Sequence, residues 1–228
     1  EKMSHSQAAQ LPRGLIVEMD FAVLPGHALM QEICRERLAA EGIAFDAKCA
    51  AKAFCGRSFT SGLNALCAKA QKTADAAALA ADCNARFGEA LTAALDEIPA
   101  GFVAFVKAAL TKGVKVILMT RADVEAVRAR FGDSDPEKLI ISHEAMPGFC
   151  CCGWEGWRRV ARKYDLHERL CVAVAGSGLS VKGALTSGFG VLVKPHPLVE
   201  YQDISGSDAR ITEYSSGLLT EVCRILRI

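Results

Sequence analysis

A long interval without any strand-like run separates the first apolar, β-branched segment of this chain from the second. The first run is Leu15-Ile16-Val17, and the next comparable run comes only at 114–119. Three more runs occur at 139–141, 171–175 and 191–193. Such runs, alternating with helical patterns, indicate a parallel sheet that is buried on both faces. An ordinary crossover between parallel strands needs about a dozen residues, whereas this interval spans roughly ninety. The spacing therefore predicts an insertion after the first strand.

The inserted segment, residues 25–99, is rich in Ala, Leu, Lys and Glu and shows helical spacing, for example at Leu91, Leu95 and Ile98 before Pro99. We therefore expect an α/β fold with a Rossmann-like parallel core, built from residues 1–24 and 100–228, and an inserted helical cap at 25–99. Glycines are the expected breaks between the cap helices: Gly42, Gly56, Gly62 and Gly88.

The composition of the chain disfavours some classes of partner. The chain of 228 residues has 27 Lys and Arg against 26 Asp and Glu, so its net charge of +1 disfavours nucleic acid as a partner. Its longest charge-free runs fall short of the roughly 20 apolar residues that span a membrane, so no membrane partner is expected. Ten cysteines at irregular spacing behind a polar N-terminal segment favour reduced thiols and a cytoplasmic location.

Neither the cysteines nor the histidines show the spacing of a metal site. Cys150, Cys151 and Cys152 are adjacent and lack the paired C-x-x-C spacing of zinc ligands, so we expect free thiols in a loop. Four histidines have no spacing that suggests a shared metal and are expected to be structural or exposed: His27, His143, His167 and His196.

Two carboxylates follow the first predicted strand, at Glu18 and Asp20. On a strand, a separation of two residues aims both side chains at the same side. Ligands bind at the carboxyl ends of strands in open α/β sheets, so this placement favours a site. A solvated pair of carboxylates at a strand end explains the spacing equally well.

Polar residues also follow the second and fourth predicted strands. Thr120 stands beside the N-terminus of a predicted helix at 123–130, where a hydroxyl binds a phosphate oxygen or, more commonly, caps the helix. Gly176-Ser177-Gly178 precedes another predicted helix, and such a sequence forms an anion-binding concavity or an ordinary tight turn.

The succession of these segments resembles the haloacid dehalogenase superfamily, most closely its phosphoglucomutase and phosphatase branch with a helical cap. The resemblance spans residues 14–197. It implies that Glu18 and Asp20 stand at the positions of the aspartate nucleophile and the general acid/base, and Thr120 at that of the phosphate-binding hydroxyl. The sequence Gly56-Arg57-Ser58 matches a cap turn that sets substrate specificity in relatives.

Three positions depart from the pattern that the resemblance implies. Glu18 replaces the attacking aspartate, Gly176 replaces a magnesium-binding aspartate, and the lysine of the third motif falls near Cys151. The longer Glu18 side chain displaces its carboxylate by roughly an ångström, more than in-line attack tolerates. Without a second carboxylate ligand, a magnesium site is poor. Reversing all three departures together is expected to restore phosphoryl transfer.

These observations favour a catalytically impaired or inactive phosphatase-like protein that retains a pocket for a phosphorylated small molecule or another anion. The residues expected to contact the anion are Thr120, Arg121, Ser177 and Arg57, although both arginines also suit an ordinary surface position. No cofactor is expected in this case, and a protein partner stays open. The alternative is an active, Mg²⁺-dependent phosphatase or related hydrolase of a small phosphorylated metabolite that uses Glu18 and Asp20.

Overall fold

The computed structural model describes residues 11–54, 57–72, 75–143 and 154–228. Its core is a six-stranded sheet of order β3-β2-β1-β4-β5-β6, in which all paired strands are parallel. The strands are β1 (Gly14–Glu18), β2 (Lys115–Met119), β3 (Leu139–Ser142), β4 (Cys171–Ala175), β5 (Gly190–Val193) and β6 (Ala209–Arg210). The predicted α/β fold with a Rossmann-like core is therefore confirmed.

Helices cover the sheet. Every residue of β1 and of β4 is buried, although successive side chains of a strand point to opposite faces, so both faces of the sheet are covered. In the core, α9 packs on α10, which lies against β4 and β5, while α7 packs on α11 and β2, and α8 on β3. These helices are α7 (Ala100–Thr111), α8 (Val124–Ala129), α9 (Trp154–Lys163), α10 (Gly178–Ser187) and α11 (Ser216–Leu226).

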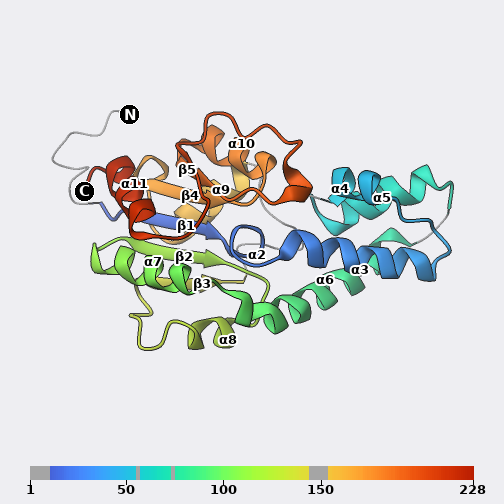
Figure 1. Ribbon diagram of the computed structural model, residues 1–228, viewed down its shortest axis with the longest axis horizontal. Helices are drawn as coiled ribbons and strands as arrows, with labels where there is room; N and C mark the ends of the chain where they lie inside the picture. The colour runs from blue at the N-terminus through green and yellow to red at the C-terminus, as the bar shows by residue number, and fades with distance from the viewer. Residues whose placement is uncertain (1–10, 55–56, 73–74, 144–153) are drawn as a thin grey trace.

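The elements that the structure describes between β1 and β2 are all helices, apart from one 3-10 turn. A short helix follows β1 directly, and two long helices then lead out to two shorter ones at the far end of the molecule (Figure 1). The helices are α2 (Met19–Ala22), α3 (Gly26–Ala40), α4 (Ala47–Phe54), α5 (Phe59–Lys69) and α6 (Ala76–Ala93), followed by a 3-10 turn at Ala94–Glu97. We call residues 25–99 the insertion; its treatment as a separate domain stays a prediction.

A side-chain cap explains where α6 of the insertion begins. Asp75 Oδ1 accepts hydrogen bonds from the backbone N–H groups of Ala77 and Ala78, at 3.1 and 3.0 Å, and starts α6.

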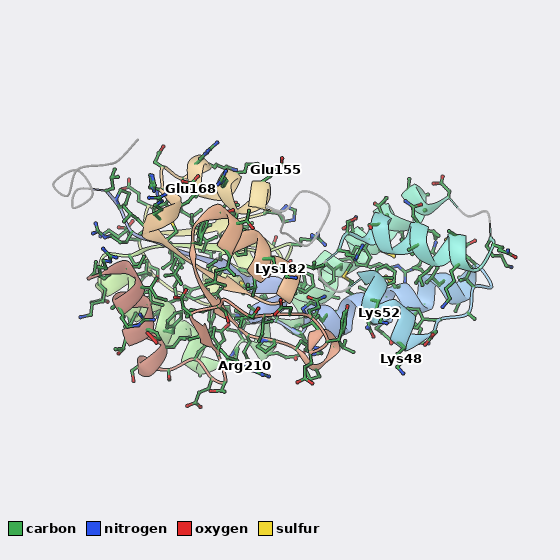
Figure 2. All side chains as sticks on the ribbon, turned by 90° about the horizontal axis from the view of Figure 1, so that it is seen from above. Lys48, Lys52, Glu155, Glu168, Lys182 and Arg210 are labelled. Carbon is green, nitrogen blue, oxygen red and sulfur yellow. The ribbon has the colours of Figure 1, made fainter. Side chains whose placement is uncertain are left out.

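Charged side chains point outward from both parts of the molecule (Figure 2), with Lys48 and Lys52 on the insertion and Glu155, Lys182 and Arg210 on the core.

Two of the predicted helix breaks are wrong. Gly62 lies inside α5 and Gly88 inside α6, because each glycine makes room for a close neighbour instead of ending a helix. A Cβ atom at Gly62 would lie 2.3 Å from the ring of Phe54, and one at Gly88 would lie 3.0 Å from the carbonyl oxygen of Arg121. Gly42 does follow the end of α3 with a positive φ of 67°, whereas Gly56 lies outside the described residues.

Candidate functional site

The candidate site lies at the carboxyl edge of the sheet, where the strand order reverses between β1 and β4. In open α/β sheets this reversal leaves a crevice in which ligands bind. Glu18 is the last residue of β1, and Gly176 and Ser177 follow β4 directly. The sequence-predicted residues Glu18 and Ser177 therefore flank the crevice.

The carboxylate of Glu18 occupies hydrogen-bond donors at this reversal of the strand order. Its Oε2 accepts a hydrogen bond of 2.8 Å from the backbone N–H of Gly176, and its Oε1 accepts one of 3.0 Å from the hydroxyl of Ser180. Only 1% of the Glu18 residue is exposed. Glu18 thus uses the kind of donors, a backbone N–H and a hydroxyl near a helix N-terminus, that would otherwise bind an anion.

Asp20 points toward β2 instead. Its Oδ1 accepts a hydrogen bond of 2.6 Å from the Thr120 hydroxyl, and its Oδ2 accepts one of 3.1 Å from the backbone N–H of Arg121. The expectation that Glu18 and Asp20 lie on the same side is therefore wrong. The strand ends at Glu18 and α2 begins at Met19, so the period of two does not extend to Asp20.

Arg121 supplies positive charge within this cluster. The interpretation of Arg121 as a surface side chain is wrong, because the residue is only 7% exposed. Its guanidinium carbon lies 5.3 Å from the centre of the Phe87 ring, a cation–π contact with α6 of the insertion. Its charge also lowers the pKa values of both Glu18 and Asp20.

Burial nevertheless dominates the ionisation of both carboxyl groups. Loss of solvation raises the pKa of Glu18 to about 7, against the opposing hydrogen bonds from Gly176 and Ser180. Loss of solvation also raises the pKa of Asp20 to about 6, although Thr120 and Arg121 stabilise its charged form. Both groups therefore titrate close to neutral pH.

Gly176 is fixed from several sides. A Cβ atom at this position would lie 2.5 Å from the Phe21 Cβ atom and 2.6 and 2.7 Å from the Phe21 backbone C and O atoms. The carbonyl oxygen of Gly176 accepts a hydrogen bond of 2.9 Å from Nε2 of buried His27. The His27 ring also lies 5.6 Å from the ring of His196.

Sequence reasoning missed the roles of Ser180 and His27. Ser180 stands three residues after Ser177, which caps α10 by accepting a hydrogen bond from the Ser180 N–H. This capping spacing was visible in the sequence. The contact of His27 with Gly176, 149 positions along the chain, had no local signal.

The remaining predicted residues take other positions. Thr120 does not cap α8, because the Asp123 side chain does so by accepting a hydrogen bond from the Ala126 N–H. Arg57 is exposed, just before α5 in the insertion. Cys151 and Gly56 lie outside the described residues.

The site residues do not fit magnesium. Mg²⁺ keeps several water ligands and binds through carboxylates that it can reach. Glu18 and Asp20 are 1% and 0% exposed, and both oxygens of each accept hydrogen bonds from the protein. Among the described residues, no group of three or more His, Cys, Asp or Glu side chains is placed to hold a metal ion.

Comparison with solved structures shows that the chain has a known fold. No protein-family model and no curated protein sequence matches the chain. Among solved structures, β-phosphoglucomutase from Clostridium difficile matches with a TM-score of 0.71 at 13% identity, covering 96% of this chain and 100% of that chain. The chain has a haloacid dehalogenase-like fold.

Two further structures with the haloacid dehalogenase-like fold contain phosphate. CbbY from Rhodobacter sphaeroides in complex with phosphate has a TM-score of 0.67 at 18% identity, covering 90% of this chain and 96% of that chain. A HAD family hydrolase from Deinococcus radiodurans with bound phosphate and sodium has a TM-score of 0.61 at 15% identity, covering 94% and 96%. In the described part of our chain, no helix is long and apolar enough to cross a membrane.

The raised pKa values predict that stability falls as the pH rises. The folded protein holds the Glu18 proton up to about pH 7, whereas an ordinary glutamate loses it near 4.5, so this stabilisation is complete below 4.5 and lost above 7. Glu18→Gln stays uncharged, so its stability relative to the unaltered protein should increase by roughly 3 kcal/mol across that window. Urea unfolding at a series of pH values measures the difference.

The matched control for this titration is Glu125→Gln, because the Glu125 side chain is 81% exposed. Its stability difference from the unaltered protein should stay nearly constant with pH. A Glu18→Gln difference that is equally constant would show that the Glu18 carboxylate does not lose solvation on folding.

Proposed function

We propose that this protein binds a small anion, such as a phosphorylated metabolite, without hydrolysing phosphate esters. The observation that carries the proposal is the Glu18 carboxylate, which accepts hydrogen bonds from Gly176 N–H and Ser180 Oγ in the crevice where the strand order reverses. An anion that enters the crevice must displace this carboxylate.

The buried carboxylates do not suit phosphoryl transfer. A nucleophile needs an approach path to the phosphorus atom and a held geometry for attack. Glu18 has both oxygens engaged and is almost fully buried, and Asp20 is held by Thr120 and the Arg121 N–H. Neither group is presented to a substrate in this arrangement, and no metal-binding set of side chains among the described residues compensates.

The donors in the crevice do suit an anion. The Gly176 N–H and the Ser180 hydroxyl already bind a carboxylate, and Arg121 adds a buried positive charge nearby. Phosphate is present in two of the similar structures, which supports an oxyanion as the ligand of this fold. We propose that protonation of Glu18, with its pKa of about 7, favours release of Gly176 N–H to the incoming anion.

The purified protein should hydrolyse p-nitrophenyl phosphate no faster than the buffer, with or without Mg²⁺. A working phosphatase would instead turn over on the order of once per second or faster. The assay measures released p-nitrophenol, with Asp20→Asn as the matched variant. Turnover that requires Mg²⁺ and is lost in Asp20→Asn would establish the alternative, an active phosphatase that uses Glu18 and Asp20.

Glu18→Ala should create an anion site that added anions fill. The substitution removes the carboxylate and leaves the Gly176 N–H and the Ser180 hydroxyl without their acceptor, so formate or phosphate should stabilise the variant. An anion at about ten times its Kd adds about 1.4 kcal/mol, which raises the Tm by roughly 3–6 °C for a protein of this length. Thermal unfolding with formate, phosphate or chloride at equal ionic strength measures the effect.

The unaltered protein and Glu125→Ala are the controls, and both should respond to formate and phosphate less than Glu18→Ala does, because an anion must first displace the Glu18 carboxylate. A folded Glu18→Ala variant whose Tm does not respond to formate or phosphate would rule out an anion site at these donors. An equally large response in the unaltered protein would show that the Glu18 carboxylate does not block the crevice.

A further inference from the structure

A small cavity lies where both ends of the insertion meet the core. Its walls come from residues 21–25 after β1, Glu97 near the end of the insertion, and residues 194–197 after β5. Its volume is about 310 Å³. Small-molecule pockets in proteins measure roughly 300–1,000 Å³, so the cavity has room for one small metabolite. Neither Glu18 nor Ser180 is among the described residues that line it.

Two opposite charges belong to this cavity and do not pair with each other. Glu97 and Lys194 both line it, and no ion pair joins them in the described part of the chain. The Lys194 ammonium donates a hydrogen bond to the carbonyl oxygen of Thr212, which leaves two of its three N–H donors for a ligand. A ligand that carries both charges would therefore meet a counter-charge for each of them.

His196 adds a neutral hydrogen-bond donor to the same wall as Lys194. Its Nδ1 accepts a hydrogen bond of 3.2 Å from the backbone N–H of Leu198, so the neutral ring carries its proton on Nε2. Burial lowers the pKa of His196, which keeps the ring uncharged at neutral pH. Lys194 and His196 together offer the kind of donors that bind a carboxylate.

The remaining walls are largely apolar and stiff. They include Val23, Leu24 and three prolines: Pro25, Pro195 and Pro197. Because each proline ring fixes its backbone φ angle, these segments have little freedom to lose when a ligand binds. An apolar group of the ligand would gain free energy by leaving water for these walls.

We propose that this cavity binds a zwitterionic α-amino acid with an apolar side chain. The Glu97 carboxylate binds the ammonium group of the amino acid, and Lys194 and the His196 Nε2–H group bind its carboxylate. The proline-rich walls contact its side chain. The site is separate from the crevice at Glu18, so it does not depend on the function proposed above.

The test titrates the full-length protein with L-leucine by isothermal titration calorimetry at neutral pH. One molecule should bind per chain, with a Kd of about 1 mM or below, as expected for so small a ligand. Two analogues each lack one charge: 4-methylpentanoate has no ammonium group, and 3-methylbutylamine has no carboxylate. Each should bind at least about tenfold more weakly, because one charged hydrogen-bond partner is lost.

Two substitutions assign the ends of the ligand. Glu97→Gln should weaken L-leucine about tenfold without weakening 4-methylpentanoate, and Lys194→Met should weaken L-leucine about tenfold without weakening 3-methylbutylamine. Asp96→Asn is the control for the acid, since Asp96 pairs with Arg130 at 2.7 Å and does not line the cavity. Lys182→Met, on α10, is the control for the lysine. Both controls should keep the affinity for L-leucine within about twofold.

The proposal is overturned if L-leucine does not bind to the folded, unaltered protein. It is also overturned if 4-methylpentanoate binds as tightly as L-leucine, because the site would then recognise an anion alone. These titrations use the unaltered protein, so they decide the matter even if Lys194→Met fails to fold. A loss from Asp96→Asn or Lys182→Met as large as that from Glu97→Gln would overturn it too, because binding would then depend on the overall charge and not on this cavity.

Discussion

Gly176→Ala should destabilise the protein by roughly 2–4 kcal/mol, because the added methyl group has no room. A Cβ atom at residue 176 would lie 2.5 Å from the Phe21 Cβ atom and 2.6 and 2.7 Å from two backbone atoms of Phe21. A backbone cannot rotate away as a side chain can, so the contact forces β4 and α2 apart. Separation of these elements would also break the hydrogen bond from Gly176 N–H to Glu18. Urea unfolding measures the loss.

Gly176→Asp should be worse still, since it adds both bulk and a buried charge to the same space. Gly156→Ala is the matched control: a Cβ atom at Gly156, inside α9, meets nothing within 4 Å. That control should be neutral or stabilising by about 0.5–1 kcal/mol. Equal stability of Gly176→Ala and the unaltered protein would show that Phe21 can move away from this position.

This steric block changes the interpretation of the three departures from the family pattern. The sequence suggests that Glu18→Asp, Gly176→Asp and Cys151→Lys together would restore activity. The structure opposes the second change, because Phe21 occupies the space beside Gly176. Glycine at 176 thus has a packing role of its own, and restoring the aspartate also requires moving the chain after β1.

The fold was predictable because its signals are local and repeated. Five apolar runs coincide closely with β1 to β5, and the strand-free interval coincides with the insertion helices. β6 was missed, because a strand of two residues, Ala209–Arg210, is too short to show a period. Gly62 and Gly88 were misinterpreted because helix–helix contacts, not turns, require a glycine there.

The candidate site was only partly predictable. The sequence identifies Glu18, Asp20 and Thr120, because polar residues after buried strands gather at one edge of a parallel sheet. It could not show that Glu18 bonds to Gly176 and Ser180, since these contacts join residues 158 and 162 positions apart. Burial of Arg121 was also invisible, because it depends on how α6 of the insertion packs over the core.

Arg121→Met should destabilise the protein by roughly 3–5 kcal/mol at pH 8, where both neighbouring carboxylates are charged. Methionine has a similar length and keeps the packing against Phe87, so the loss reports mainly the charge. Glu18 and Asp20, which have pKa values of about 7 and 6, would be left buried and negative without this compensating cation. At pH 5 both groups are mostly protonated, and the loss should shrink to about 1 kcal/mol.

Two comparisons separate charge from packing in this experiment. Arg128→Met, at a half-buried arginine whose partner Glu125 is 4.0 Å away, should cost less than about 1 kcal/mol at either pH. In a Glu18→Gln, Asp20→Asn background, Arg121→Met should lose most of its effect at pH 8, because coupled residues give non-additive changes. A loss from Arg121→Met that is the same at pH 5 and pH 8 would instead assign Arg121 to packing against Phe87. In that case, the burial of Glu18 and Asp20 would depend on the contact between the insertion and the core. It would not depend on the balance of the buried charges.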